Sequence, residues 1–176
     1  IFHSTHLFNA MSQLHHRNPG AVGAVLIHSE MTCEVIADGV HVHRDLFKLL
    51  QKDKTADQIV LVTDALTPTE LFSTNLYANG EEVEFTGGCF HRKSDGVIAG
   101  SALTMIRGVK NLVDFGFSLT DAIKCACGNP ARIMNYRNKG FLIPGYDSDV
   151  VVFDRNFEIG LVFVCGKMKF NRMTEI

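Results

Sequence analysis

The sequence lacks a long apolar run, an excess of basic residues and a Cys-x-x-Cys pair, and each absence argues against a class of protein. No stretch approaches the ~20 apolar residues of a membrane-spanning helix, so we expect no membrane partner. The formal net charge of −2 indicates no basic footprint, so nucleic acid is not an expected partner either. None of the five cysteines forms a Cys-x-x-Cys pair, so we expect buried, reduced thiols in a cytoplasmic protein rather than disulfides or a zinc site.

The composition is that of a soluble globular protein of about one domain. The chain has 176 residues, of which 46% are hydrophobic and 20% charged. It does not begin with Met, and its first residues, IFHSTH, are typical of the inside of a domain. We therefore expect that Ile1 is not a natural start.

Apolar segments alternate with helical patterns in the first part of the chain. We expect a strand over 1–4, a loop over 5–20, a helix over 21–28, a strand over 33–37, a helix over 44–54 and a strand over 58–62. The last strand, QIVLV, is continuously apolar, as in a parallel sheet covered on both faces. This order predicts an α/β fold with right-handed crossovers.

The second part differs in character. Asn79-Gly80 between alternating stretches predicts a hairpin within an antiparallel insertion over about 72–98. We expect helices over 103–115 and over 119–127, the second capped by Ser118, then a break at 128–130 and a helical turn over 131–136. From 139 onward, strands with turns at Pro144-Gly145 and Cys165-Gly166 predict a separate β structure.

Histidines concentrate before residue 65 and end apolar stretches. Seven of the eight lie there: His3, His6, His15, His16, His28, His41 and His43. Asp64 follows the most apolar strand. Strand ends of this kind build the active-site face of an α/β barrel, so the pattern favours a metal-dependent hydrolase.

Several of these residues keep two interpretations. His6 is a metal ligand or a structural loop histidine. Asp64 is a metal or proton-transfer group, or a turn or helix-capping residue. His41 and His43 are a metal pair, or His41 contacts substrate and His43 is structural.

His41, whose ring can add a donor, and three further residues could bind an anion. Arg17 can make bidentate contacts to phosphate, or it is plain solvated surface. Asn9 and Ala10 lie in a loop whose backbone N–H groups could face the same anion.

Four ordered motifs, THLFNAM…HHRNPG, ADGVHVH, LVTDA and GVIAGSALTM, resemble the N-acetylglucosamine-6-phosphate deacetylases of the amidohydrolase superfamily. GNPARIM and KGFLIPGYDSDVVVFD match the superfamily's closing segments. The resemblance implies the C-terminal part of a TIM-like (β/α)8 metal-dependent hydrolase barrel over 1–138, its sixth to eighth strands, and the C-terminal strands of a small β-sandwich domain over 139–176. It also implies hydrolysis of the N-acetyl group of N-acetylglucosamine 6-phosphate.

The same resemblance implies roles for individual residues. His6 and Asp64 are expected to hold a divalent metal, Zn2+ by this resemblance, and Asp64 is also the expected catalytic acid and base. Asn9 and Ala10 are expected to hold the sugar phosphate. Arg17 is expected to reach the phosphate from the neighbouring subunit of a homodimer.

His41 is expected to contact the phosphorylated amino-sugar substrate.

The chain departs from the family pattern in its metal ligands. No Glu-Gly-Pro motif occurs, and no histidine precedes His3, although the family's metal site uses both a Glu and a second His upstream. We therefore expect the C-terminal half of a deacetylase, inactive by itself. Two alternatives remain: another amidohydrolase, such as a cyclic amidase or deaminase, and a non-catalytic fragment that packs on a partner chain.

Overall fold

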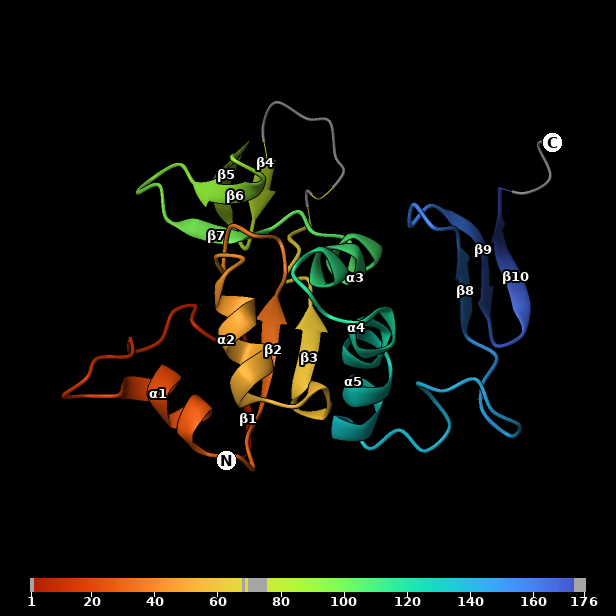
Figure 1. The fold of residues 1–176 in the computed structure, drawn as a ribbon. Helices are drawn as coiled ribbons and strands as arrows, with labels where there is room; N and C mark the ends of the chain where they lie inside the picture. Colours follow the sequence, from red (N-terminus) through yellow and green to blue (C-terminus); the bar gives the residue numbers. More distant parts are fainter. Residues whose placement is uncertain (1, 68, 70–75, 173–176) are drawn as a thin grey trace. The chain divides into compact units, whose positions relative to one another are not determined.

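A computed structural model describes residues 2–67, 69 and 76–172, which divide into two compact units between Ala126 and Cys127. The first unit contains a parallel sheet of order β1-β2-β3 that alternates with helices (Figure 1). Its parallel part consists of β1 (His3–Ser4), α1 (Gly20–Ile27), β2 (Thr32–Ile36), α2 (Leu46–Asp53), the 3-10 helix η1 (Ala56–Gln58) and β3 (Ile59–Val62). Two later helices, α3 (Met105–Asp114) and α4 (Leu119–Ala126), contact β3 and each other. The predicted alternation of strands and helices is confirmed.

The core lies around β2 and β3 because both strands are apolar. Ile59, Val60 and Leu61 are all buried, which confirms the prediction from the QIVLV run. Phe47 of α2 is also fully buried, and its ring centroid lies 4.9 Å from that of Phe115. This contact joins α2 to the end of α3.

An antiparallel sheet of order β4-β5-β6-β7 follows the parallel strands. Its strands are β4 (Leu76–Ala78), β5 (Glu81–Thr86), β6 (Cys89–Arg92) and β7 (Ile98–Ser101). Asn79 and Gly80 have φ values of 53° and 82°, as a two-residue hairpin turn requires, so the predicted hairpin is confirmed. The predicted insertion begins at 72, but residues 72–75 lie outside the described part. A parallel bridge between Ala65 and Ser101 ties β7 to the segment after β3.

The second unit contains a helix and an antiparallel sheet of order β10-β9-β8. Its elements are α5 (Gly128–Ile133), β8 (Val150–Phe153), β9 (Ile159–Val164) and β10 (Lys167–Asn171). The predicted break at 128–130 is wrong, since α5 begins at Gly128. Pro130 fits there because the first turn of a helix has no hydrogen-bond partner for its N–H groups.

Strand structure before residue 150 was predicted too broadly. The segment over 139–149 is not a strand, and side-chain ion pairs and hydrogen bonds hold it in place of strand pairing. Lys139 Nζ lies 2.8 Å from Asp147 Oδ2 and 2.6 Å from Asp149 Oδ2, and Asp149 Oδ1 accepts a bond of 2.8 Å from the Cys165 N–H. The predicted turn at Cys165-Gly166 is confirmed, with φ values of 49° and 72°.

The thiols are free, as predicted, but only Cys33, Cys89 and Cys125 are buried. Cys127 and Cys165 are exposed, so the expectation of burial is wrong for these two. In the described part of the chain, no helix is long and apolar enough to cross a membrane. The observed units divide at 126/127, whereas the domain assignment at 138/139 rests on sequence and stays a prediction.

Candidate active site

The candidate residues follow the ends of three neighbouring parallel strands. β1 pairs with β2, and β2 pairs with β3, both in parallel. His6 follows β1, His41 follows β2 and Asp64 follows β3. Parallel strands end at one edge of their sheet, and ligands of α/β folds bind at this carboxyl edge.

The backbone of this edge is unusually strained. His6, Phe8, Ala10 and Asp64 have φ values of 25°, 79°, 50° and 49°. A positive φ at a residue other than Gly costs ~1–3 kcal/mol and persists only where the surrounding structure enforces it. Three of the predicted site residues therefore sit on a backbone that other contacts must hold.

Glu34 of β2 provides such contacts for His6. Its Oε2 atom accepts a hydrogen bond of 3.4 Å from the His6 N–H, and its backbone oxygen accepts one of 2.8 Å from the Leu7 N–H. Its Oε1 atom lies 3.3 Å from His3 Nε2. The Nδ1 atom of His6 is buried and has no hydrogen-bond partner in the described part of the chain. A partnerless buried nitrogen costs ~1–3 kcal/mol, which fits an atom prepared for a ligand.

Asn9 and Ala10 differ in which hydrogen-bond donors they leave for a ligand. The Asn9 N–H donates to the His6 carbonyl over 3.0 Å, and its side-chain amide donates to the carbonyls of His6 and Leu7. Asn9 therefore uses its donors to hold the loop. The Ala10 N–H makes no hydrogen bond within residues 2–67, 69 and 76–172, so it is the donor that remains for an anion.

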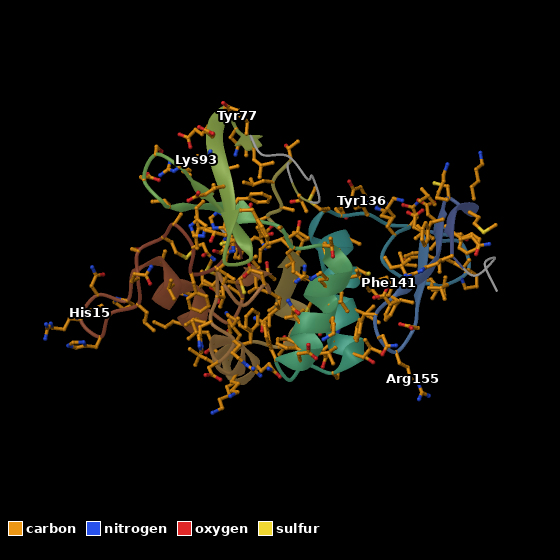
Figure 2. The ribbon with its side chains drawn as sticks, turned by 90° about the horizontal axis from the view of Figure 1, so that it is seen from above. His15, Tyr77, Lys93, Tyr136, Phe141 and Arg155 are labelled. Carbon is orange, nitrogen blue, oxygen red and sulfur yellow. The ribbon has the colours of Figure 1, made fainter. Side chains whose placement is uncertain are left out.

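Arg17 lies on an exposed loop between β1 and α1. Figure 2 shows the neighbouring His15 at the far end of this loop, pointing away from the ribbon. Among the described residues, the Arg17 guanidinium forms no ion pair. The side chain is available to a ligand or to a second subunit.

His41 and His43, the alternative metal pair, have different surroundings. His41 Nδ1 lies 2.6 Å from Asp38 Oδ2, and each side chain is 5% exposed. His43 is 71% exposed and lies 3.7 Å from Asp45 Oδ2. The two histidines thus have separate carboxylate partners, one buried and one on the surface.

Asp64 is held by the segment that ends β7. The Ser101 N–H donates to the Asp64 carbonyl over 2.8 Å, the Ser101 hydroxyl donates to the Thr63 carbonyl, and the Ser101 carbonyl accepts from the Leu66 N–H over 3.1 Å. A Cβ atom at Gly100 would lie 2.9 Å from the Asp64 carbonyl oxygen. Ser101 is fully buried. These hydrogen bonds of Ser101, which we call the Ser101 clamp, fix the backbone of Asp64. The Asp64 carboxylate is exposed and therefore stays accessible.

Sequence reasoning assigned no role to Glu34, Asp38 or Ser101. Glu34 stands in the apolar strand TCEVI, where a carboxylate needs partners, and this signal was available. Asp38 precedes His41 by three residues in a turn, a weaker signal. Ser101 acts on a segment 37 residues earlier in the sequence, and no local pattern predicts this contact.

The described residues contain no group of three or more His, Cys, Asp or Glu side chains that could hold a metal ion.

Known proteins match most of this chain. Residues 1–169 match the model of the amidohydrolase family. An N-acetylglucosamine-6-phosphate deacetylase of Lysinibacillus sphaericus is 34% identical over 166 residues, which are 94% of this chain and 43% of that protein. A putative N-acetylgalactosamine-6-phosphate deacetylase of Escherichia coli K12 is 35% identical, over 93% of this chain and 98% of that protein.

The crystal structure of N-acetylglucosamine-6-phosphate deacetylase from Thermotoga maritima has a TM-score of 0.91 and 31% identity, over 97% of this chain and 47% of that one. The chain thus spans less than half the length of the Lysinibacillus and Thermotoga proteins. The family match covers nearly the whole chain. The chain belongs to the amidohydrolase family.

Proposed function

We propose that the protein containing this chain hydrolyses the N-acetyl group of N-acetylglucosamine 6-phosphate, giving glucosamine 6-phosphate and acetate. The observation that carries the proposal is that His6, His41 and Asp64 follow three neighbouring strands at one edge of a parallel sheet. The backbone of this chain also resembles that of a deacetylase, with a TM-score of 0.91. In this proposal the sheet is the sixth to eighth strands of a (β/α)8 barrel, and the second unit is part of a small β-sandwich domain.

His6 and Asp64 would hold a divalent metal together with ligands outside this chain. The partnerless Nδ1 of His6 and the accessible carboxylate of Asp64 fit such a group. Imidazole nitrogen and carboxylate oxygen are donors that zinc accepts. When bound, such a cation supplies Lewis acidity and lowers the pKa of water to about 7.

Asp64 would handle the proton in both halves of the reaction. Its carboxylate accepts the proton of the water that attacks the acetyl carbonyl, and it returns that proton to the departing amine. The clamp of Ser101 on the Asp64 backbone would keep this carboxylate in place.

The 6-phosphate would be held at the loop after β1. The open Ala10 N–H and the exposed Arg17 guanidinium supply the donors, and Asn9 holds the start of the loop through the His6 and Leu7 carbonyls. In the proposed homodimer, Arg17 reaches the site of the neighbouring subunit, which suits its place on the exposed loop that also carries His15, labelled in Figure 2. A cytoplasmic location remains part of the proposal.

The test is acetate release by the complete protein from N-acetylglucosamine 6-phosphate and from the unphosphorylated sugar. The proposal requires clear preference for the phosphorylated sugar, and equal rates would contradict the phosphate-binding role of Ala10 and Arg17. N-acetylgalactosamine 6-phosphate is the second candidate substrate, since the Escherichia coli relative is named for it. A higher kcat/KM for that sugar would transfer the assignment to it.

A further inference from the structure

Asp38 and His41 form a buried pair inside the turn after β2. The pair joins Asp38 Oδ2 to His41 Nδ1 over 2.6 Å. The second carboxylate oxygen, Oδ1, accepts hydrogen bonds of 2.9 Å from the backbone N–H groups of Val40 and His41. Asn111 of α3 donates to the Ala37 carbonyl over 2.8 Å and so fastens the start of the same turn.

The charge of Asp38 determines which nitrogen of His41 carries a proton. Burial acts to raise the pKa of Asp38, but the hydrogen bonds from the His41 side chain and from the Val40 and His41 backbones outweigh it and lower this pKa. Burial and the nearby Asp38 charge together raise the pKa of the Cys89 thiol of β6. An ionised carboxylate only accepts hydrogen bonds, so Nδ1 of His41 must be the donor. In the neutral imidazole, Nε2 is then an acceptor.

The Nε2 atom of His41 has no hydrogen-bond partner among the described residues. Among the described residues, the hydrogen bonds of the His41 side chain consist of the one bond from Nδ1 to Asp38. A histidine whose one nitrogen is fixed by a buried carboxylate presents the other nitrogen in a defined orientation and tautomer.

The pair of His43 and Asp45, two residues further on, provides an internal comparison. Its atoms are 3.7 Å apart, and its side chains are 71% and 58% exposed. Exposed pairs contribute little because water and salt screen them. The same two residue types therefore occur once as a surface contact and once as a buried, hydrogen-bonded unit.

We propose that Asp38 is a positioning residue that holds His41 with Nδ1 protonated and Nε2 free to accept a hydrogen bond from a hydroxyl of the sugar. The identity of the sugar rests on the proposed function. The tautomer does not, because it follows from contacts within the chain.

The first test is the 15N NMR spectrum of the His41 ring in the complete protein, recorded as the pH is raised until the ring signals no longer change. The proposal requires the tautomer with hydrogen on Nδ1, and hydrogen on Nε2 would overturn it. This measurement uses the wild-type protein, so it needs neither a variant nor enzymatic activity. If the wild type releases no acetate from either sugar phosphate, the proposed function fails while the tautomer still decides the role of Asp38.

The second test is kinetic. Asp38→Asn keeps an oxygen for the backbone N–H groups but places the amide NH2 against Nδ1, where it can only donate. We expect kcat/KM to fall about 10–100-fold, as for outer partners of functional histidines, and Asp45→Asn to leave it unchanged. In a His41→Ala background, Asp38→Asn should cause no further loss. An unchanged kcat/KM in Asp38→Asn, or the full loss persisting without His41, would show that Asp38 does not act through His41.

Discussion

Gly100→Ala tests whether the end of β7 holds Asp64 in its working conformation. The added Cβ would lie 2.9 Å from the Asp64 carbonyl oxygen and 2.8 Å from two carbons of the Leu66 side chain, whereas ordinary contact begins at 3.4 Å. The Asp64 backbone must therefore move by roughly half an ångström, since overlap at that distance is strongly repulsive. Such overpacking costs about 1–3 kcal/mol of stability. A displaced catalytic group lowers kcat by up to about 100-fold.

The matched control is Gly140→Ala in the second unit. Its Cβ would lie 2.8 Å from Ala131 Cβ and 2.9 Å from the Cys127 carbonyl oxygen, so the contact is equally tight, and its φ of 87° adds strain. Thermal unfolding and steady-state kinetics of both variants in the complete protein separate stability from catalysis. We expect both to be destabilised and only Gly100→Ala to lose kcat with KM nearly unchanged. Equal kcat in the two variants would refute the clamp.

Three further predictions concern binding, assembly and pH. Arg17→Ala should lower kcat/KM for the phosphorylated sugar and have little effect on the unphosphorylated one, and equal losses would make Arg17 structural. The 176-residue chain alone should bind zinc weakly after dialysis and release no acetate, because zinc sites require at least three protein ligands and the described residues contain no group of three His, Cys, Asp or Glu side chains that could hold a metal; a monodisperse monomer with one tight zinc and turnover would contradict this. Because its pKa is lowered by folding, Asp38 stabilises the protein above its unfolded pKa of ~3.9, and this contribution disappears as pH falls through the folded pKa. Denaturant unfolding should thus show wild type and Asp38→Asn converging in acid, and a constant difference would contradict the assignment.

The sequence predicts those elements whose signal is local. The continuously apolar run QIVLV is typical of a strand covered on both faces of a sheet. Asn79-Gly80 adopts the two positive φ values of a tight hairpin with little penalty. Both features appear in the structure because no distant contact competes with them.

Elements that depend on distant contacts are predicted poorly. The apolar residues before Val150 read as a strand, yet Lys139 and its two aspartate partners hold that segment in turns. The GNP sequence reads as a break, yet Pro130 fits the first turn of α5.

The candidate site divides in the same way. His6, His41 and Asp64 are visible in the sequence because they end apolar strands. Glu34 gives a sequence signal as a carboxylate in an apolar strand, but its partner His6 cannot be predicted, and Ser101 gives no local signal at all. Each acts on a residue about 30 positions or more away, and the contact exists only after folding.

The most direct test of the account is the kcat of Asp64→Asn in the complete protein, measured with N-acetylglucosamine 6-phosphate alongside the bound metal content. An amide cannot take a proton from water, and general acid–base groups contribute about 10²–10⁴-fold. We predict a loss of kcat in that range with the fold retained. A near-normal kcat with unchanged metal content would remove Asp64 from the chemistry and contradict the proposed site.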